Sequence, residues 1–413
     1  MKSYSIDSIR QKFPALQSSD APIYFDGPGG TQMVENAIHS MTDYITNGMA
    51  NLHGTFDTSV RTDQLLDETR KAAANLLGAK PKEIAFGPNM TTLAFSIARS
   101  IGKMLTNEDE IIVTELDHRA NVDPWVTLAK DVGATIKYIP LHVETMTLDM
   151  EALDDLITEK TKLVAVGMAS NVTGTITNVK EVIRQAKRVS ALTIVDAVHA
   201  VPHFPIDFTE LGADVLLCSG YKFFGPHVGI AAIQEQLFEK LETYKLAPAP
   251  SYYPDKLETG TQNHEGIAGL KGAIKFLEDL GKGQTTRERI VDGMKQIDAY
   301  EEKLAAKLEE FFRTTPSITL YRADKNVPKT PTFAFTVKDA NSREITKWLA
   351  DHYNMNVADG DFYASIMAEK FDVYNNGGWI RIGLAPYNTI EEIEQFIKAM
   401  DNVLINKTLS ETT

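Results

Sequence analysis

VLLCSGYKFFG, at residues 215–225, is the stretch that decides the fold. Its first three residues are all apolar, without the alternation of a half-exposed strand, and Lys222 follows after a short polar turn. A strand that is apolar on both faces is typical of a mostly parallel sheet covered by helices on both sides. Ligands bind at the carboxyl ends of the strands in such sheets, so Lys222 is predicted to lie at a ligand site.

Comparable apolar runs recur on the amino-terminal side of this stretch, and helical patterns separate them. Between about residue 23 and residue 233 the predicted strands are Ile84–Phe86, Ile111–Val113, Leu163–Met168 and Leu192–Val195. Alternation of buried strands with helices is the pattern of an α/β protein with a parallel sheet. The sequence therefore predicts a large α/β region with helices on both faces of one sheet.

The composition changes after about Gly281. A long charged amphipathic helix is expected over Arg287 to Phe312, followed by shorter strands and a closing helix whose Thr389 and Glu392 have the spacing of a capping box. A chain of 413 residues is also too long for one ordinary core. We expect a segment at 1–22 packing on the small domain, a large domain at 23–283 and a small α+β domain at 284–413.

Charge and cysteine content narrow the class of protein. The net charge is −14, from 42 basic and 56 acidic side chains, and no basic run suggests nucleic-acid binding. Cys218 is the only cysteine, so no intramolecular disulfide can form and a cytoplasmic location is expected. The sequence begins without an apolar signal-peptide core, and it has no apolar segment long enough to span a membrane.

Polar side chains follow the predicted strands at their carboxyl ends. Desolvation at such an edge lowers the pKa of a lysine, and only the free amine of Lys222 can form a Schiff base. Asp196, directly after its strand, could hold a cofactor ring nitrogen in its protonated form. Ser219, with the hydroxyls and N–H groups at Met90, Thr91 and Thr92, could bind a phosphate at a helix N-terminus.

Each of these residues has a plainer interpretation when it is taken alone. Lys222 could be a solvated loop lysine, and Asp196 could cap a turn. His199 and His203 have the spacing of zinc ligands on a helix, but neighbouring prolines and the lack of other ligands argue against a metal site. Cys218 at the end of an apolar run is more typical of a small buried hydrophobe than of a nucleophile.

Together the segments resemble the class V aminotransferase group of fold-type I pyridoxal 5'-phosphate (PLP) enzymes. Within that group they are most similar to cysteine desulfurases and selenocysteine lyases, which carry Asp-x-x-(His/Gln) and then Ser-Gly-His-Lys about 25 residues later. The matching residues are Asp196, His199, Ser219, Gly220, Tyr221 and Lys222. The resemblance extends over nearly the whole chain and implies PLP as the cofactor, bound covalently to Lys222.

The resemblance assigns expected roles to further residues. His118 matches the histidine that stacks on the cofactor ring, and Asn171 matches the asparagine that contacts the ring oxygen. Arg381 matches the arginine that binds the substrate carboxylate, and Gly29 lies in a loop that runs close to the substrate. Gly260 and Thr261 resemble the pair that one subunit lends to the phosphate of the other, which implies a homodimer. The implied substrate is a small amino acid.

Two departures bear on the reaction. Tyr221 replaces the histidine that usually precedes the lysine, which removes one phosphate ligand or leaves a phenol in its place. The catalytic loop reads Gly360-Asp361-Phe362-Tyr363, where desulfurases carry Gly-x-x-Cys. Without that cysteine we expect C–S lyase or transaminase chemistry that uses Lys222 and His118 and no protein persulfide. Two alternatives stay open, namely an epimerase in which Tyr363 donates a proton and a non-catalytic scaffold.

Overall fold

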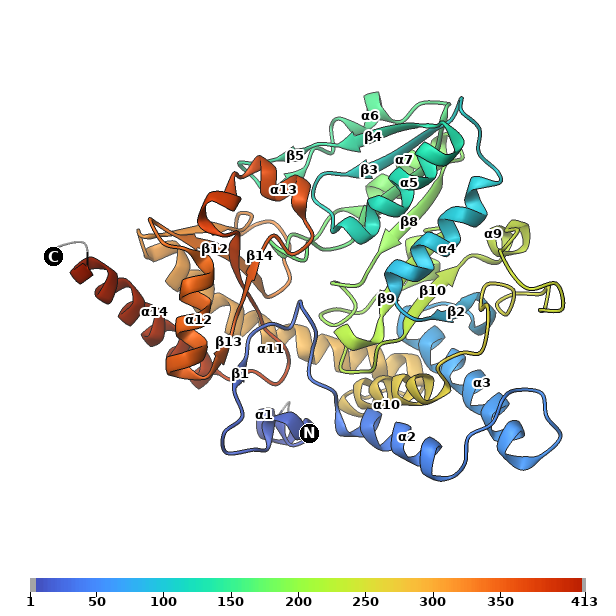
Figure 1. Ribbon diagram of the computed structural model, residues 1–413, viewed down its shortest axis with the longest axis horizontal. Helices are drawn as coiled ribbons and strands as arrows, with labels where there is room; N and C mark the ends of the chain where they lie inside the picture. Colours follow the sequence, from blue (N-terminus) through green and yellow to red (C-terminus); the bar gives the residue numbers. More distant parts are fainter. Residues whose placement is uncertain (1–4, 411–413) are drawn as a thin grey trace.

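The computed structural model describes residues 5–410, with side chains as far as residue 405. Its largest element is a seven-stranded sheet in the order β2-β10-β9-β8-β7-β3-β4 (Figure 1). Only β10 runs antiparallel to its neighbours, so the sheet is mostly parallel, as predicted. The strands are β2 (Ile84–Gly87), β3 (Glu110–Thr114), β4 (Thr135–Ile139), β7 (Thr161–Gly167), β8 (Leu192–Asp196), β9 (Val215–Ser219) and β10 (Gly229–Ile233).

Helices cover both faces of this sheet, which explains the unbroken apolar runs. Ile111 and Val113 of β3 share one core cluster with Trp125, whereas Ile112 between them belongs to the cluster on the opposite face. The first face is covered by α4 (Met90–Gly102), α5 (Asp123–Val132) and α9 (Glu235–Lys240). The second is covered by α2 (Glu35–Thr46), α3 (Asp57–Leu77), α7 (Val179–Arg188), α8 (Phe208–Leu211) and α10 (His264–Leu280). The short elements α6 (Leu153–Leu156), β5 (Leu141–His142) and β6 (Thr147–Leu148) lie beside the sheet edge.

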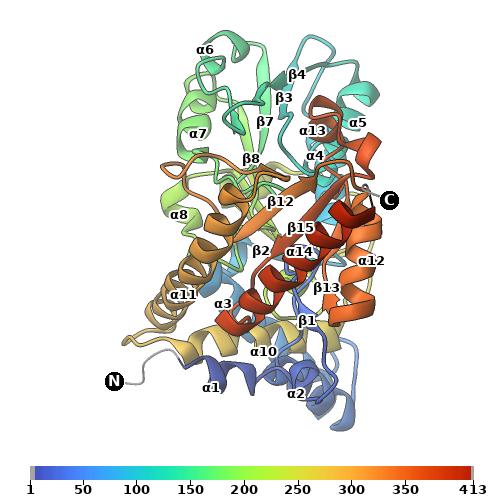
Figure 2. The same cartoon turned by 90° about the vertical axis from the view of Figure 1, so that its left-hand side faces the viewer.

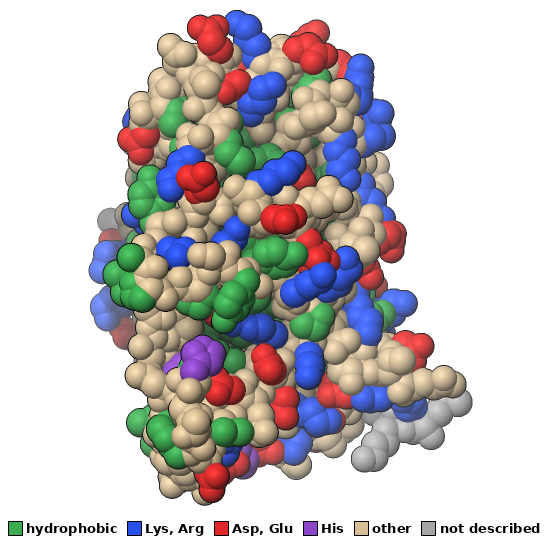
Figure 3. Space-filling view, turned by 90° about the vertical axis from the view of Figure 1, so that its right-hand side faces the viewer, with side chains coloured by type: hydrophobic (Ala, Val, Ile, Leu, Met, Phe, Trp, Pro, Cys, Tyr) green, Lys and Arg blue, Asp and Glu red, His purple; other side chains and the backbone are tan. Residues whose placement is uncertain are grey.

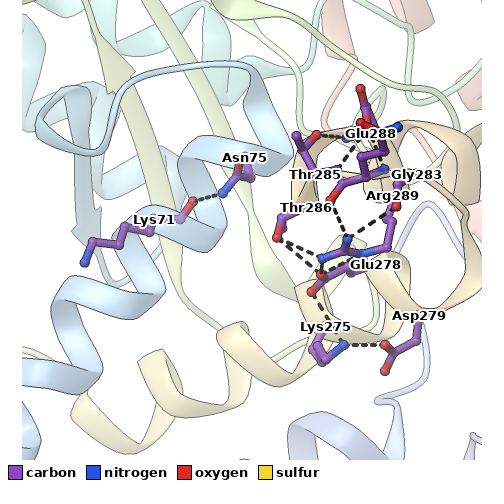
Figure 4. Close-up of polar contacts among 11 residues, drawn as sticks. Lys71, Asn75, Lys275, Glu278, Asp279, Gly283, Thr285, Thr286, Glu288 and Arg289 are labelled. Atoms are coloured by element: carbon purple, nitrogen blue, oxygen red, sulfur yellow. Dashed lines mark hydrogen bonds and ion pairs between the residues drawn. The ribbon is translucent and has the colours of Figure 1, made fainter.

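Helix α11 (Thr286–Thr314) connects the two regions of the chain. Its start is a capping box, because the Thr285 hydroxyl accepts from the N–H of Glu288 at 3.2 Å and the Glu288 carboxylate accepts from the N–H of Thr285 at 2.9 Å (Figure 4). Arg289 also donates through Nε to Glu278 of α10 at 3.0 Å. These contacts fix the direction in which the long helix leaves the large sheet. The helix predicted over residues 287–312 is confirmed and slightly longer.

The second region is a four-stranded antiparallel sheet with helices packed against it. The strand order is β11-β12-β15-β14, and Figure 2 shows α14 in front of this sheet with α11 and α12 to either side. Phe312, Phe333 and Phe396 form the centre of its separate core. The elements are β11 (Ile318–Tyr321), β12 (Thr332–Val337), α12 (Ser342–Tyr353), β13 (Met355–Asn356), β14 (Ala358–Gly360), α13 (Ser365–Lys370), β15 (Trp379–Gly383) and α14 (Ile390–Ser410). The predicted capping box of α14 is present, with reciprocal bonds between Thr389 and Glu392.

The N-terminal segment contacts both regions. At the end of α1 (Ile6–Arg10), Arg10 donates to the Glu392 carboxylate of α14 at 2.7 Å. Phe13 packs against Tyr387 on one side and against Phe276 of α10 on the other, with ring centroids 4.9 and 5.5 Å apart. The domain bounds 1–22, 23–283 and 284–413 stay a prediction, and the residues at the two ends of the chain, 1–4 and 411–413, lie outside the described part.

The segment at 23–30 brings a loop of the large region to the small sheet. Strand β1 (Ile23–Tyr24) pairs in parallel with β13, and the carbonyl of Phe25 accepts from the N–H of Gly383 at 2.7 Å. Asp26 forms an isolated bridge with Gly383, so the turn that follows lies over the end of β15. This junction places the Gly-rich turn at 27–30 between Arg381 of β15 and Lys222 after β9.

Candidate active site

A cavity of about 820 Å³ opens where the carboxyl ends of β7, β8 and β9 meet the N-terminus of α4. Its size lies within the range of ligand and cofactor pockets. The turn at 27–30 and the loop at 359–363 form its other walls. Nearly all of the predicted site residues line it, namely Gly29, Met90, Thr91, His118, Asn171, Asp196, His199, Ser219, Tyr221, Lys222, Tyr363 and Arg381. Gly260 and Thr261 do not, and their predicted role across a subunit interface stays a prediction.

Lys222 lies in a single 3₁₀ turn directly after β9. Its Nζ donates to the carbonyl oxygen of Gly29 at 3.1 Å and also to that of Pro28. Burial, and then the nearby charge of Arg381, lower the pKa of Lys222 to about 8. A substantial fraction of the amine is therefore free at neutral to mildly alkaline pH, which a covalent bond to a carbonyl cofactor requires.

Asp196 ends β8 beside this lysine. Its Oδ1 accepts from the N–H of Val198 at 2.8 Å, which fixes the carboxyl group at the cavity floor. Desolvation raises the pKa of Asp196 to about 7, and the neighbouring Asp117 adds to the effect. A positively charged ring nitrogen placed against this carboxylate would lower that pKa again and would itself be held protonated.

His118 covers the cavity from the turn after β3. Its Nδ1 accepts from the N–H of Ala120 at 2.9 Å, so the neutral ring carries its proton on Nε2. Burial lowers the pKa of His118 to about 4, and the charges of Lys222 and Arg381 act in the same direction. A neutral imidazole at neutral pH suits stacking on an aromatic cofactor ring.

Ser219 and the N-terminus of α4 form an anion cradle at one end of the cavity. The Ser219 hydroxyl accepts from the N–H of Met90 at 3.0 Å, and Asn89 caps the helix by accepting from the N–H of Thr92 at 2.9 Å. Gly229 of β10 packs so tightly on this turn that a Cβ there would lie 2.4 Å from the backbone of Asn89. Oriented N–H groups and the helix dipole make this end suitable for a phosphate.

Tyr221 stands beside the cradle, at the position where the resemblance expects a histidine. Its ring stacks on His227 with centroids 4.8 Å apart, and both side chains line the cavity. The Nζ of Lys222 lies 4.7 Å from the centre of the Tyr221 ring. His199, by contrast, is buried and its Nε2 shares hydrogen bonds with the hydroxyls of Thr330 and Thr332 at 3.1 and 2.9 Å.

Arg381 faces the cavity from the middle of β15 and is only 3% exposed. Its Nη2 pairs with Asp26 Oδ1 at 2.6 Å, and its Nη1 donates to the carbonyl of Asn171 at 3.1 Å. Its Nε and the Oδ1 of Asn171 are buried and have no hydrogen-bond partner among the described residues. Buried polar atoms without partners indicate a site that a polar ligand completes.

The loop at 359–363 covers this arginine and His118. The Phe362 ring lies 3.9 Å from Arg381 Cζ, and the Tyr363 ring stacks on His118 with centroids 5.4 Å apart. Both residues have positive φ angles, of 51° and 57°, which is uncommon for aromatic residues and is typical of functional loops. Tyr363 is 70% exposed and thus stands at the mouth of the cavity.

Cys218 is fully buried in β9, within the core cluster under α10 and α3. It does not line the cavity. Burial raises the pKa of its thiol far above the ordinary value, so it has no thiolate character at neutral pH. Among residues 5–410, no group of three or more His, Cys, Asp or Glu is arranged to hold a metal ion.

Three site residues escaped the prediction from sequence. Asp26 lies in a Gly-rich stretch that is typical of a turn, although it pairs with Arg381 across 355 residues of sequence. Phe362 and His227 gave no signal of their own, because an isolated aromatic residue after a strand or turn is most often part of a core. The loop at 360–363, which contains Phe362, is noticeable in the sequence because it lacks the cysteine that desulfurases carry there.

Comparison with known proteins agrees with the fold. Residues 23–396 match the family model described as aminotransferase class V. The aminotransferase-like protein FGM3 of Gibberella zeae is 32% identical, over 97% of this chain and 99% of that protein. The apo structure of a cysteine desulfurase from Thermococcus onnurineus has a TM-score of 0.87 at 27% identity, over 98% and 100% of the two chains. The cysteine desulfurase CsdA of Escherichia coli, in its S-sulfonic acid form, has a TM-score of 0.86 at 25% identity, over 98% and 99%.

The chain belongs to the class V aminotransferase family of PLP-dependent enzymes. The residues present fit PLP, because the cavity combines a partly deprotonated lysine, a carboxylate, a neutral imidazole and an anion cradle. The lysine follows β9, and the carboxylate ends the neighbouring strand, β8. The predicted fold type, enzyme class and cofactor are therefore confirmed, while the role of each residue belongs to the proposal below.

Proposed function

We propose that this enzyme acts on a small α-amino acid by C–S lyase (β-elimination) or aminotransferase chemistry, without a protein persulfide. The observation that carries the proposal is the separation of the only thiol, on Cys218, from the cavity that holds Lys222. When bound, PLP withdraws electrons from the substrate's Cα and so acidifies its proton. The family membership and the shared cavity argue against a purely structural role.

The proposed roles follow from where each side chain lies. Lys222 carries the cofactor and, once the substrate amine has displaced it, its free Nζ removes the proton from Cα. Asp196 holds the ring nitrogen, and His118 stacks on the ring. Asn171 contacts the ring oxygen, while Ser219, Met90, Thr91 and Tyr221 hold the phosphate end. His199 lines the cavity as a further cofactor-binding residue, and the hydroxyls of Thr330 and Thr332 hold its ring in place.

Epimerisation is the second candidate, and one observation favours it. Tyr363 stands at the cavity mouth, across His118, and its exposed phenol could protonate Cα from the face opposite Lys222. An amino-acid panel separates the reactions by their products. Pyruvate with a released thiol indicates elimination, an oxo acid in step with a consumed amino acceptor indicates transamination, and the opposite enantiomer indicates epimerisation.

A homodimer and a cytoplasmic location are part of the proposal. Figure 3 shows hydrophobic side chains in patches on one side of the molecule. Large apolar residues are exposed on the segment between α2 and α3 and on the segment that leads from α9 toward Gly260 and Thr261, namely Met49, Phe56, Tyr244, Leu246 and Tyr252. A second copy of the chain that covered this face would bury these side chains. Gly260 and Thr261 of one subunit would then lie close to the phosphate end of the other subunit's site. Among the described residues, no helix has the length and apolar character needed to cross a membrane.

Replacing Arg381 with lysine is expected to raise KM for amino acids by roughly tenfold to a hundredfold, the cost of one charge-assisted hydrogen bond. Lysine keeps the charge but loses the planar fork that binds a carboxylate with two donors. The visible spectrum of the bound cofactor should not change. Steady-state kinetics with an amino acid and with the matching amine check this. If the parent enzyme uses the amine as well as the amino acid, Arg381 is not the carboxylate anchor.

Replacing Cys218 with alanine is expected to leave turnover within about twofold of the parent, because the buried thiol does not line the cavity and is protonated. Turnover and the melting temperature are measured together, so that a packing defect in the core is recognised. Mass spectrometry of the parent protein, alkylated during turnover, provides a check that does not depend on the variant. A persulfide trapped on Cys218 would contradict the proposed chemistry.

A further inference from the structure

We propose that the enzyme prefers an α-amino acid whose side chain ends in a cation, such as an ammonium group. The inference deepens the proposed function and rests on it, because the substrate must be anchored by its carboxylate at Arg381 and by its amine at the cofactor. Those two anchors fix the direction of the third substituent of Cα, the side chain, toward the remaining open wall of the cavity.

That wall is the loop at 359–363. Phe362 covers the guanidinium of Arg381, and its carbonyl accepts from Asn171 Nδ2 at 2.9 Å. The carbonyl of Tyr363 accepts from the N–H of Arg119 at 2.8 Å, while its ring covers His118. The loop is thus tied to the neighbourhood of both anchors, and a substrate side chain leaving Cα has to pass along it.

The loop presents one carboxylate, on Asp361, that has no salt bridge to a described residue. Asp361 accepts from the N–H of Tyr363 and from the hydroxyl of Tyr374, both at 3.0 Å, and it lines the cavity. Asp359 lies on the other face of β14, where it accepts from the Thr346 hydroxyl of α12 at 2.6 Å. Among the described residues, the Lys and Arg side chains that line the cavity are Lys222 and Arg381. Arg381 pairs with Asp26, and Lys222 is the proposed carrier of the cofactor.

Two aromatic residues, Tyr363 and Tyr374, lie beside the Asp361 carboxylate. Tyr363 is 70% exposed and Tyr374 is 49% exposed, and Asp361 is hydrogen-bonded to both residues. Aromatic faces attract cations, and a carboxylate beside them adds direct charge attraction. An anionic side chain would instead meet unpaired negative charge. The mouth of the cavity therefore favours positive, then neutral, then negative side chains.

The preferred order of side-chain charge is tested on the holoenzyme with three S-substituted L-cysteines of similar size. They carry an S-(2-aminoethyl), an S-propyl or an S-carboxymethyl group. Dissociation constants come from the change of the cofactor spectrum on binding, and kcat/KM comes from product release. We expect the aminoethyl compound to bind and react about tenfold better than the propyl compound, the effect of one favourable charge pair. The carboxymethyl compound should be the poorest.

Asp361→Asn should shrink the aminoethyl-to-propyl ratio at least severalfold. Asp372→Asn is the matched control, since it removes the same charge from a residue that does not line the cavity, and it should keep the ratio. Equal or weaker use of the aminoethyl compound, or an unchanged ratio in Asp361→Asn, overturns this inference while leaving the proposed function intact. Failure of all three compounds to bind contradicts the proposed function itself.

Discussion

Lys222→Ala is expected to abolish the visible absorbance of lysine-bound PLP and to lower turnover by more than about a thousandfold. The variant loses both the amine that carries the cofactor and the base that acts at Cα. The cavity walls should stay intact, since the hydrogen bonds of Nζ are to carbonyl oxygens of the turn at 27–30 and no core packing depends on it. Absorbance after incubation with excess PLP, and turnover of the best amino acid from the panel, check this.

Lys398→Ala serves as the control for this variant, because Lys398 is an exposed lysine on α14, far from the cavity lining. It should keep both the absorbance and the turnover. If Lys222→Ala retained the spectrum of a lysine-bound cofactor, another lysine would have to carry PLP, and the assignment of the site would be wrong.

Asp196→Ala should retain PLP while turnover falls by about a hundredfold to a thousandfold, as for other preorganised electrostatic groups. Without the carboxylate the ring nitrogen loses its proton and the cofactor becomes a poor electron sink. Binding should persist because Lys222, the Ser219 cradle and His118 are unchanged. Cofactor content and turnover are measured on the same preparation.

Asp196→Asn is the conservative partner of that variant. It keeps the size of the side chain and an acceptor for the N–H of Val198, but it cannot hold a cation as a carboxylate does. A loss similar to that of the alanine variant is expected. Near-parent turnover in either variant would show that Asp196 does not act through charge on the cofactor ring.

The site and capping residues that could be predicted from the sequence are those whose positions follow from a short local sequence pattern. Asp196 and Lys222 each follow a strand apolar on both faces, and parallel strands bring their carboxyl ends to one edge of the sheet. The capping box at Thr389 is likewise local, with its partner Glu392 three residues away. Such features depend on a few neighbouring residues, and so a single sequence reveals them.

The contacts that sequence reasoning missed are long-range. Asp26 reaches Arg381 only because β1 pairs with β13 and the following turn crosses the end of β15. Phe362 covers the same arginine because it and Tyr363 both have a left-handed backbone conformation. Aromatic side chains do not predict that conformation. The acidic, aromatic mouth of the cavity follows from the same loop. These features depend on how two regions of the chain are joined, which neither periodicity nor spacing specifies.

Reduction of the holoenzyme with borohydride, followed by proteolysis and mass spectrometry, identifies the lysine that carries the cofactor. The structure places Lys222 alone among the lysines in the lining of the cavity, within residues 5–410. We therefore expect the pyridoxyl group on the peptide that contains Lys222, in one copy per chain. A label on another lysine, or no label in a protein that retains PLP, would contradict the proposed active site.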